Sequence, residues 1–458
     1  MREQKKTAAS TVRDMTQGNP LKQILGFALP MLLGILFQQF YSMVDTVIVG
    51  KFLGVEALAS VGATSAINFM INGFVIGVTA GFAIPAAQRF GAKDYRGMRR
   101  YVANTAWLSI AFSIVMTAVV GALTWKILVW MKTPETIIEG AYHYIFIIFL
   151  GIPVVYLYNV TASLIRALGD SRTPVYFLVF SSLVNIVLDY VTIRWLGLGV
   201  SGPAIATVIS QTASGVLCLI YMRKRFEILR FEEGETAFRY DLCLNLCGMG
   251  IPMGLQYSIT AIGSVILQSA VNTLGAVAVA SVTAGEKINL FCCCVFDALG
   301  GTMATYAGQN VGAGKVDRII QGVKAATVLG IIYGVAAFVL LFTFGGYLPL
   351  LFVDAGETEV IRQAHMYLSA NSLCYFLLVF VNVWRFAIQG MGYSAFAILA
   401  GVCEMIARAL VGFVGVSTFG YPAVCFASPL AWLFADCFLV PAFWHCIGRL
   451  RRLFAGRS

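Results

Sequence analysis

Long apolar segments separated by short polar loops cover almost the whole chain. Each segment has about the length that a helix needs to cross the hydrocarbon core of a bilayer, which is roughly 20 residues. The apolar segments are residues 21–50, 57–86, 97–122, 138–165, 173–196, 200–222, 241–272, 276–308, 318–345, 359–388, 394–416 and 421–447. The pattern therefore predicts twelve transmembrane helices.

The composition agrees with a helical membrane protein. Apolar residues make up 59% of the 458 residues and charged residues only 12%, whereas soluble domains contain roughly 25% charged residues. The strands of a membrane barrel alternate apolar and polar residues over roughly ten positions, which this chain does not do. Helices satisfy their backbone hydrogen bonds internally, as lipid requires. We therefore expect an all-α polytopic membrane protein. The polar first twenty residues predict no signal peptide.

Basic residues are distributed unevenly between alternate loops. One set of loops contains most of them, and the other set contains only Lys51, Lys126, Lys132, Arg194 and Arg362. Because cytoplasmic loops are enriched in Lys and Arg, this asymmetry predicts that both termini are cytoplasmic and that the number of spans is even. The net charge of +10 is explained by topology, so we expect no nucleic-acid partner. We expect a multi-pass protein of the cell (inner) membrane.

The two halves of the chain share motifs in the same order. Gln88 to Ala92 and Gln309 to Ala313 both read Gln-x-x-Gly-Ala, and Tyr144 corresponds to Tyr367. Six spans per half preserve orientation, so the repeat predicts two six-helix bundles related by a pseudo-twofold axis along the membrane normal. The expected domains are a cytoplasmic N-terminal tail (1–20), an N-lobe (21–222), a cytoplasmic linker (223–240), a C-lobe (241–447) and a cytoplasmic C-terminal tail (448–458).

Polar side chains recur at helical spacing inside the apolar segments. A charge at the bilayer centre costs roughly 2.5–3.5 kcal/mol on insertion scales, so such side chains should face a bundle interior or an aqueous cavity. Single Ser and Thr residues are equally compatible with hydrogen bonds between packed helices. The clearest stripes are Gln38, Tyr41, Ser42 and Asp45; Ser60, Thr64, Asn68 and Asn72; Asn185 and Asp189; Thr207 and Gln211; and Gln256, Thr260, Ser264, Gln268 and Asn272.

Asp45 and Asp189 carry the functional hypothesis. A carboxylate at membrane depth is costly unless a proton or a cation neutralises it, and two carboxylates in one pocket cannot both ionise cheaply. Asn185 and Thr207 would complete a set of hard oxygen ligands suited to an alkali cation. We predict that these four residues form a cation- or proton-coupling site, which would be a metal site only if the ion is Na⁺.

The second half does not repeat this arrangement, because its first span lacks an acid to match Asp45. Glu286 and Asp297 are cavity candidates in the eighth span, with a local pairing of Glu286 and Lys287 as the alternative. Glu404 and Arg408 have the i, i+4 spacing of an intrahelical ion pair, which we interpret as structural. Asp436 has no assigned role.

Four segments resemble the multidrug and toxic compound extrusion (MATE) family. They are QQFYSMVDTVIVGKFLGVEALASVGA, SSLVNIVLDY, GVSGPAIATVISQ and AGQNVGAGKVDRI, and the likeness extends over essentially the whole chain. The resemblance implies a cation-coupled antiporter whose N-lobe ligands map onto Asp45, Asn185, Asp189 and Thr207. It also implies a bend of the first helix near Pro30. One branch of the family has carboxylates on helices seven and ten, and their absence here argues for coupling in the first half.

Together, these expectations predict a secondary active multidrug efflux transporter. It would exchange H⁺ or Na⁺ for amphipathic, cationic organic compounds by alternating access, without a further cofactor and as a monomer. The candidate residues of the substrate cleft are Phe37, Gln38, Tyr41, Asn68, Asn72, Gln256, Tyr257, Glu286 and Asp297.

Two other classes of function remain open. A flippase for lipid-linked precursors, of the same superfamily, would need basic residues inside its cavity, and only Lys287 and Arg408 fall deep in spans. An intramembrane enzyme would need a nucleophile with a base or a metal cluster. The three histidines are scattered near helix ends, so we expect no enzyme.

Overall fold

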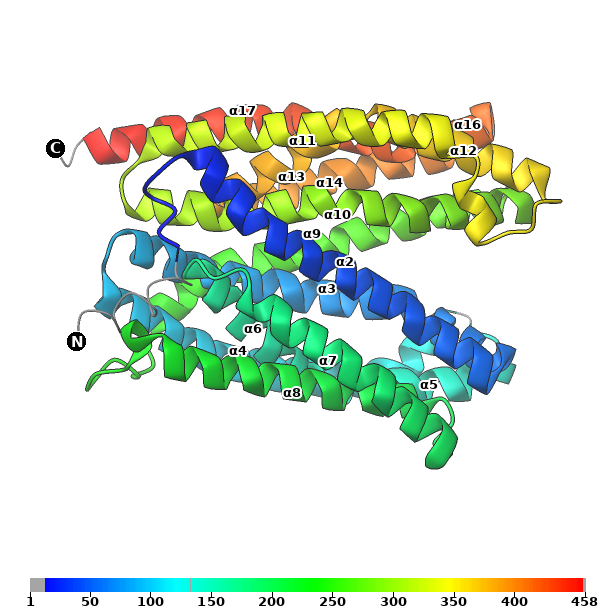
Figure 1. The fold of residues 1–458 in the computed structure, drawn as a ribbon, viewed down its shortest axis with the longest axis horizontal. Helices are drawn as coiled ribbons and strands as arrows, with labels where there is room; N and C mark the ends of the chain where they lie inside the picture. Colours follow the sequence, from blue (N-terminus) through cyan, green and yellow to red (C-terminus); the bar gives the residue numbers. More distant parts are fainter. Residues whose placement is uncertain (1–12, 132, 456–458) are drawn as a thin grey trace. The chain divides into compact units, whose positions relative to one another are not determined.

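The computed structural model describes residues 13–131 and 133–455, and these residues form helices joined by short loops (Figure 1). No strand occurs in these two ranges. The all-α class expected from the apolar pattern is therefore confirmed. The basic residues Arg2, Lys5, Lys6, Lys132 and Arg457 of the topology argument lie outside the described residues, as do the outer parts of both predicted tails.

The helices form two compact units. Unit 1 contains Leu33–Gly254, and unit 2 contains Met15–Leu32 together with the chain from Leu255 onward. Two long helices are shared: α2 (Pro20–Leu53) begins in unit 2 and ends in unit 1, whereas α9 (Tyr240–Asn272) begins in unit 1 and ends in unit 2. The units thus change over inside helices, at places that differ from the lobe boundaries expected at residues 222 and 241.

A proline precedes each change of unit. Pro30 lies inside α2 just before Leu32, and Pro252 lies inside α9 just before Gly254. Proline removes one backbone hydrogen bond of a helix and permits a kink there. Each shared helix therefore lacks one backbone hydrogen bond, and can kink, close to the point where it passes from one unit to the other.

Within unit 1, helices follow the predicted spans closely. The fourth span is a bent pair, α5 and α6, whose axes meet at 46°. The fifth ends in a π-helical turn, η1. The bounds are α3 (Val55–Gly91), α4 (Tyr95–Trp130), α5 (Glu135–Leu150), α6 (Ile152–Ala167), α7 (Thr173–Tyr190), η1 (Val191–Trp195), α8 (Ser201–Arg225) and the 3₁₀ turn η2 (Glu227–Leu229).

Unit 2 repeats this series. Its α10 has 37 residues, as α3 has, and its tenth span is again a bent pair, here at 52°. The bounds are α10 (Ala276–Gly312), α11 (Val316–Phe344), η3 (Leu348–Leu351), α12 (Thr358–Leu373), α13 (Tyr375–Gly390), α14 (Ala395–Leu410), the π-helical turn η4 (Val411–Gly415), α15 (Val416–Phe419), α16 (Tyr421–Cys425) and α17 (Ala427–Ala455). The internal repeat expected from the shared motifs thus reappears in the bends and π-helical turns.

The bend between α5 and α6 follows from local sequence. Gly151 separates the two helices, and Pro153 lies in the first turn of α6, where its missing N–H breaks no helical hydrogen bond. The corresponding bend in unit 2 occurs at Cys374 without a proline. Apolar periodicity alone could not distinguish these bent pairs from straight spans.

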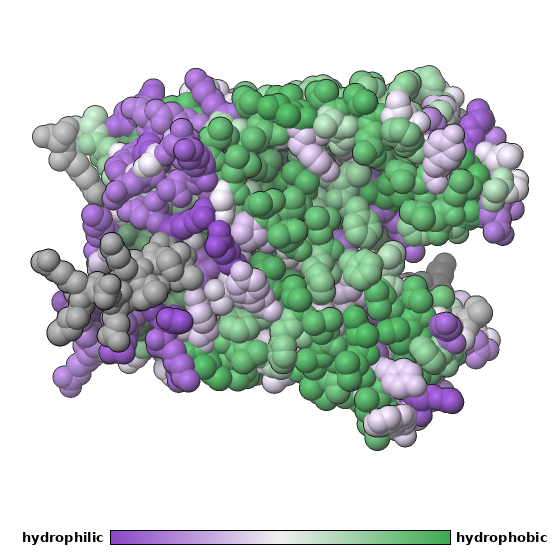
Figure 2. Space-filling view, viewed as in Figure 1, coloured by the Kyte–Doolittle hydropathy of each residue, from purple (hydrophilic) through white to green (hydrophobic). Residues whose placement is uncertain are grey.

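Large apolar side chains cover the outer surface of the helices. Leu29, Ile114, Val187 and Ile332 are each about 60% exposed, at 60%, 60%, 62% and 62%. Figure 2 shows apolar side chains along the middle of the helices and polar ones toward the ends. In the described residues, ten helices are long and apolar enough to cross a membrane, or twelve when each bent pair counts as one span. This surface is suited to lipid.

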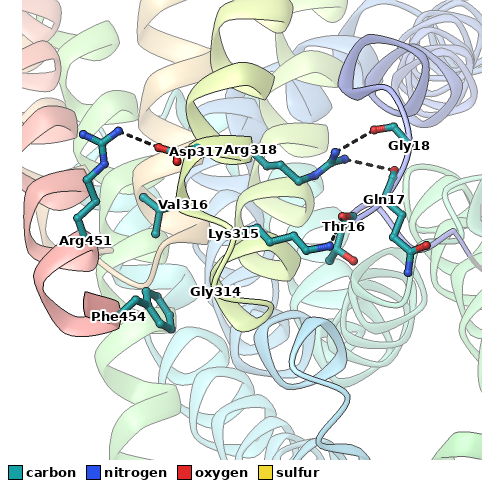
Figure 3. Close-up of a pocket in the computed structure, with 10 residues that line it drawn as sticks. All are labelled: Thr16, Gln17, Gly18, Gly314, Lys315, Val316, Asp317, Arg318, Arg451 and Phe454. Carbon is teal, nitrogen blue, oxygen red and sulfur yellow. Dashed lines mark hydrogen bonds and ion pairs between the residues drawn. The ribbon is translucent and has the colours of Figure 1, made fainter. Parts of the chain in front are cut away.

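The chain segment before α2, residues 15–18, is held by Lys315 and Arg318 at the start of α11. Arg318 donates to the carbonyls of Gln17 and Gly18 at 3.2 and 2.9 Å, and Lys315 donates to Thr16 O at 2.8 Å (Figure 3). Arg318 also donates to the carbonyl of Met15 at 3.1 Å. These groups border a pocket of about 590 Å³. Lys315 and Arg318 are engaged with the backbone and Arg451 with Asp317, so we interpret the pocket as part of an anchor for α2.

The linker before α9 is held by unit 1 in a related way. Asn104 on α4 accepts from Arg239 N at 2.8 Å and donates to Ala237 O at 3.3 Å. Arg99 binds Glu235 through two hydrogen bonds of 2.5 and 2.8 Å. This hydrogen bonding by Arg99 lowers the pKa of Glu235 to about 2.

The Arg99–Glu235 pair predicts how pH affects the linker. The pKa of Glu235 is lower in the folded protein, so its contribution to stability is fully present above about pH 4.5 and is lost as the pH falls toward 2. Glu235→Gln should therefore increase hydrogen exchange of residues 232–239 at neutral pH, with a local loss of roughly 1.5–3 kcal/mol. Glu233→Gln, at an exposed position, is the matched control. Equal exchange in both variants would contradict the role given to the pair.

Small residues let α3 and the first part of α9 approach closely within unit 1. Gly77 and Gly81 on α3 are spaced i, i+4, as are Gly250 and Gly254 on α9. A Cβ atom on Gly81 would lie 2.6 Å from Gly250 Cα, and one on Gly77 would lie 2.4 Å from Met253 O. Such small-xxx-small pairs are a common means of packing helices in membranes.

Gly81→Val should therefore destabilise unit 1. Overpacking typically costs about 1–3 kcal/mol, and contact with backbone leaves no flexible side chain to move away. Gly62→Val on the same helix is the control, because a Cβ there meets nothing within 4 Å. We expect the thermal unfolding temperature in detergent to fall for Gly81→Val and to change little for Gly62→Val. Similar unfolding temperatures for the two variants would show that the helices do not pack at these glycines.

Candidate functional site

Three helices of unit 1 bring polar side chains to one place. Tyr41 and Asp45 lie one turn apart on α2, and Asn185 and Asp189 lie one turn apart on α7. Thr207 comes from α8. Asn185 and Asp189 are buried, whereas Tyr41, Asp45 and Thr207 are half-buried. The structure thus places the four predicted coupling residues together.

Asn185 connects the cluster. In the amide orientation that satisfies both ends of the side chain, its nitrogen donates to Asp189 Oδ2 and to Tyr41 Oη, each at 3.1 Å. Its oxygen accepts from Thr207 N, also at 3.1 Å. One amide therefore ties α7 to α2 and to α8.

The two carboxyl groups face each other. Asp45 and Asp189 are within side-chain hydrogen-bonding reach. Oδ1 of each is buried and has no hydrogen-bond partner among the described residues. Ionised carboxylates only accept hydrogen bonds, so two facing carboxylates with unpartnered oxygens need a shared proton or a small cation. The oxygen-rich donor set fits either species.

A tyrosine extends the cluster beyond the predicted residues. Tyr144 on α5 is buried and lies within electrostatic range of Asp45, Asp189 and Tyr41. Its position in the sequence indicated only the internal repeat. Because it stands in a separate, bent span, no spacing along α2 or α7 could assign it to the site.

The fold also places a π-helical turn beside the acids. η1 begins at Val191, immediately after α7, and Thr192 Oγ1 donates to the carbonyl of Asp189 at 3.2 Å. Single π-helical turns often occur at functional sites, where they change the direction of nearby side chains. The end of α7 is therefore positioned by backbone geometry as well as by Asn185.

The predicted cleft residues occur in both units. In unit 1, Asn72 donates to Asn68 Oδ1 at 2.5 Å. On the same unit, Gln38 is exposed and Phe37 is half-buried. Pro30 lies inside the part of α2 that belongs to unit 2. Their roles in substrate binding and helix bending stay predictions.

In unit 2, the candidate residues differ in accessibility. Gln256 is buried and accepts from Gln389 at 2.6 Å, while Tyr257 is half-buried. Glu286 and Asp297 are exposed on α10. Lys287 lies over the ring of Phe352 at 5.6 Å, so its cationic end is directed to an aromatic face.

Unit 2 also contains a buried charged cluster. Glu404 accepts from Arg408 at 3.4 Å, which confirms the intrahelical ion pair expected from their spacing. It accepts from Arg385 on α13 as well. Sequence spacing could not identify this second partner, since Arg385 lies on another helix. Asp436 on α17 is buried nearby, within electrostatic range of Arg385 and Glu404.

Comparisons with known proteins agree with this architecture. A model of the MatE family matches residues 30–191 and residues 252–414, once in each half. The chain is similar to "Probable multidrug resistance protein YoeA" of Bacillus subtilis (strain 168), with 30% identity over 383 residues, 82% of this chain and 80% of that protein. It is similar to "Multidrug export protein MepA" of Staphylococcus aureus (strain MSSA476), with 23% identity over 406 residues, 86% of this chain and 89% of that protein.

A solved structure has the same fold. It is described as an outward-facing conformation of a multidrug resistance MATE family transporter of the MOP superfamily, with a TM-score of 0.89 and 21% identity, and the match covers 95% of this chain and 98% of that chain. The family resemblance and the predicted fold class are confirmed. Since the family model matches most of the chain in two segments, the protein belongs to the MatE family and is a multi-pass membrane transporter rather than an enzyme.

Proposed function

We propose that this transporter exports amphipathic organic cations in exchange for H⁺ or Na⁺, and that Asp45, Asn185, Asp189 and Thr207 form the coupling site. The observation that carries the proposal is the facing pair of carboxyl groups, each with a buried oxygen that lacks a partner. The names of the relatives, which refer to multidrug resistance and export, support small organic substrates.

Coupling follows from charge at this site. A proton or Na⁺ that enters neutralises part of the charge of Asp45 and Asp189 and stabilises one conformation of the cluster. If binding of the ion weakens binding of the drug, the drug weakens the ion by the same factor. Each pH unit contributes about 1.36 kcal/mol, and 100 mV contributes about 2.3 kcal/mol per charge moved. Together they are sufficient for substantial accumulation.

The geometry favours a proton as the ion of this conformation. A direct hydrogen bond between two carboxyl groups requires one proton, whereas an alkali ion would stand between the oxygens. The hydroxyl of Tyr41 and the amide of Asn185 provide further hydrogen-bonding groups at the same place.

Both termini are proposed to be cytoplasmic. The loops that are rich in Lys and Arg lie on the same side of the membrane as the termini, and such loops are usually cytoplasmic.

A flippase function has less support. Such a protein would meet phosphate groups with free basic side chains, but Arg408, which lies deep in a span, is paired with Glu404. The second deep cation, Lys287, packs over Phe352.

The deciding experiment is transport of ethidium by purified protein in proteoliposomes, with sodium and proton gradients imposed separately. We expect ethidium to accumulate when the proton gradient is imposed and to be unaffected by sodium alone. Accumulation driven only by sodium would assign the site to Na⁺. Absence of transport under either gradient would overturn the proposed function.

A further inference from the structure

A second group of charged side chains is buried in unit 2, whereas the coupling site belongs to unit 1. Arg385, Glu404, Arg408 and Asp436 are 6%, 3%, 7% and 7% exposed. They come from α13, α14 and α17, which pack against one another in the same unit. The proposed coupling mechanism does not use any of them.

Hydrogen bonding within this group is unequal. Both arginines bind Glu404, one through each carboxylate oxygen. Both oxygens of Asp436 are buried and have no hydrogen-bond partner among the described residues. The Nε atom of Arg385 is also buried and has no hydrogen-bond partner among these residues. A buried ionised carboxylate without a partner is strongly unfavourable. Asp436 in this conformation is therefore best accounted for as a neutral acid.

The surrounding charges determine which kind of ligand, a metal cation, an anion or a proton, can bind at Asp436. Arg385 and Glu404 act on it electrostatically, and Arg408 acts through Glu404. Two guanidinium groups oppose a metal cation, and no group of three or more His, Cys, Asp or Glu that could hold a metal occurs in the described part of the chain. An external anion would have to compete with Glu404 for both arginines. A proton is the remaining species that fits.

Other helices that contact α17 have their charged residues toward one end. These are Asp317, Arg318 and Lys324 in the first half of α11, and Glu359, Arg362 and His365 in the first half of α12. Arg318 binds the segment before α2, and Arg362 binds Glu359. Asp297 on α10 is within electrostatic range of Arg385 and is therefore a further acid that acts on the buried group through this arginine.

We propose that Asp436 is a second proton-binding site of this transporter, located in unit 2 and controlled by Arg385. In the conformation seen, the Asp436 carboxyl group holds the proton and Arg385 binds Glu404. On release, the proton leaves to water, and the Asp436 carboxylate takes a hydrogen bond from Arg385. Binding of the proton at Asp436 does not require that the transport function is correct, whereas its use in the transport cycle rests on that function.

The binding of the proton is tested by infrared difference spectroscopy of the full-length protein in lipid during a pH titration. We expect a carbonyl band of a protonated carboxylic acid that Asp436→Asn removes and Asp436→Glu retains. Asp354→Asn, at an exposed loop position, should leave the band unchanged. The band should also persist in Asp189→Asn, which separates it from the site in unit 1. A spectrum of Asp436→Asn identical to that of the parent protein would overturn the proposal.

The use of this proton in transport is tested in proteoliposomes by counting protons moved per ethidium. We expect a lower ratio for Asp436→Asn than for the parent protein and an unchanged ratio for Asp354→Asn. If the parent protein transports ethidium and the ratio is the same in both variants, Asp436 has no role in coupling. If the infrared band is present but no ethidium is transported, the proposed function fails while the proton site stands.

Discussion

Replacement of Asp45 with Asn is expected to lower proton-driven export of ethidium at least roughly 100-fold, which corresponds to about 2.7 kcal/mol. The amide retains the size of the side chain and a place for hydrogen bonds, but it cannot take up and release a proton. Asp189 would then face a neutral amide instead of a carboxyl group, and the pair could no longer change charge together. The measurement is ethidium efflux under an imposed pH gradient, with the amount of protein in the membrane determined separately.

Thr46→Val on the same helix is the matched control. Thr46 follows Asp45 but is exposed, and its hydroxyl donates only to the backbone carbonyl of Ser42 at 2.9 Å. We expect its export to remain close to that of the parent protein. Asp189→Asn should have the same defect as Asp45→Asn, and the double variant should be no worse, since the two acids act as one unit. Retained export by Asp45→Asn at normal expression would refute the coupling site.

Much of the fold follows from patterns that lie along the chain. Apolar length predicts the spans, and α3 and α10 begin and end within a few residues of the expected bounds. The spacing of Asn185 and Asp189 predicts that both lie on one face of α7. These predictions succeed because the period of a helix and the thickness of a bilayer are local constraints.

Relations between helices were much harder to predict. The pairing of Glu404 with Arg408 could be predicted because both lie on α14, but the pairing with Arg385 depends on how α13 packs against α14. Tyr144 joins the coupling site for the same reason, through α5. The sharing of α2 and α9 between units has no local signal except Pro30 and Pro252, which permit bending but do not say to which unit each helix end belongs.

Arg385→Ala is expected to cause the largest loss of stability of any single substitution considered. Arg385 binds Glu404, and it also acts electrostatically on Asp436. Its removal leaves the buried Glu404 carboxylate with only the 3.4 Å contact to Arg408, and breaking a buried ion pair on one side typically costs about 3–5 kcal/mol. We expect this loss in the free energy of unfolding, measured by denaturant or thermal unfolding in detergent.

A surface ion pair provides the comparison for this prediction. Arg362 binds Glu359 at 2.7 Å on α12, but both side chains are exposed, so Arg362→Ala should change the free energy of unfolding little. The triple variant Arg385→Met, Glu404→Gln and Arg408→Met should recover part of the stability lost in Arg385→Ala, because it removes the buried acid together with both of its cationic partners. A loss for Arg385→Ala no greater than that for Arg362→Ala would mean that the buried acids of unit 2 are neutral without the arginine. In that case Arg385 would not control the proton on Asp436.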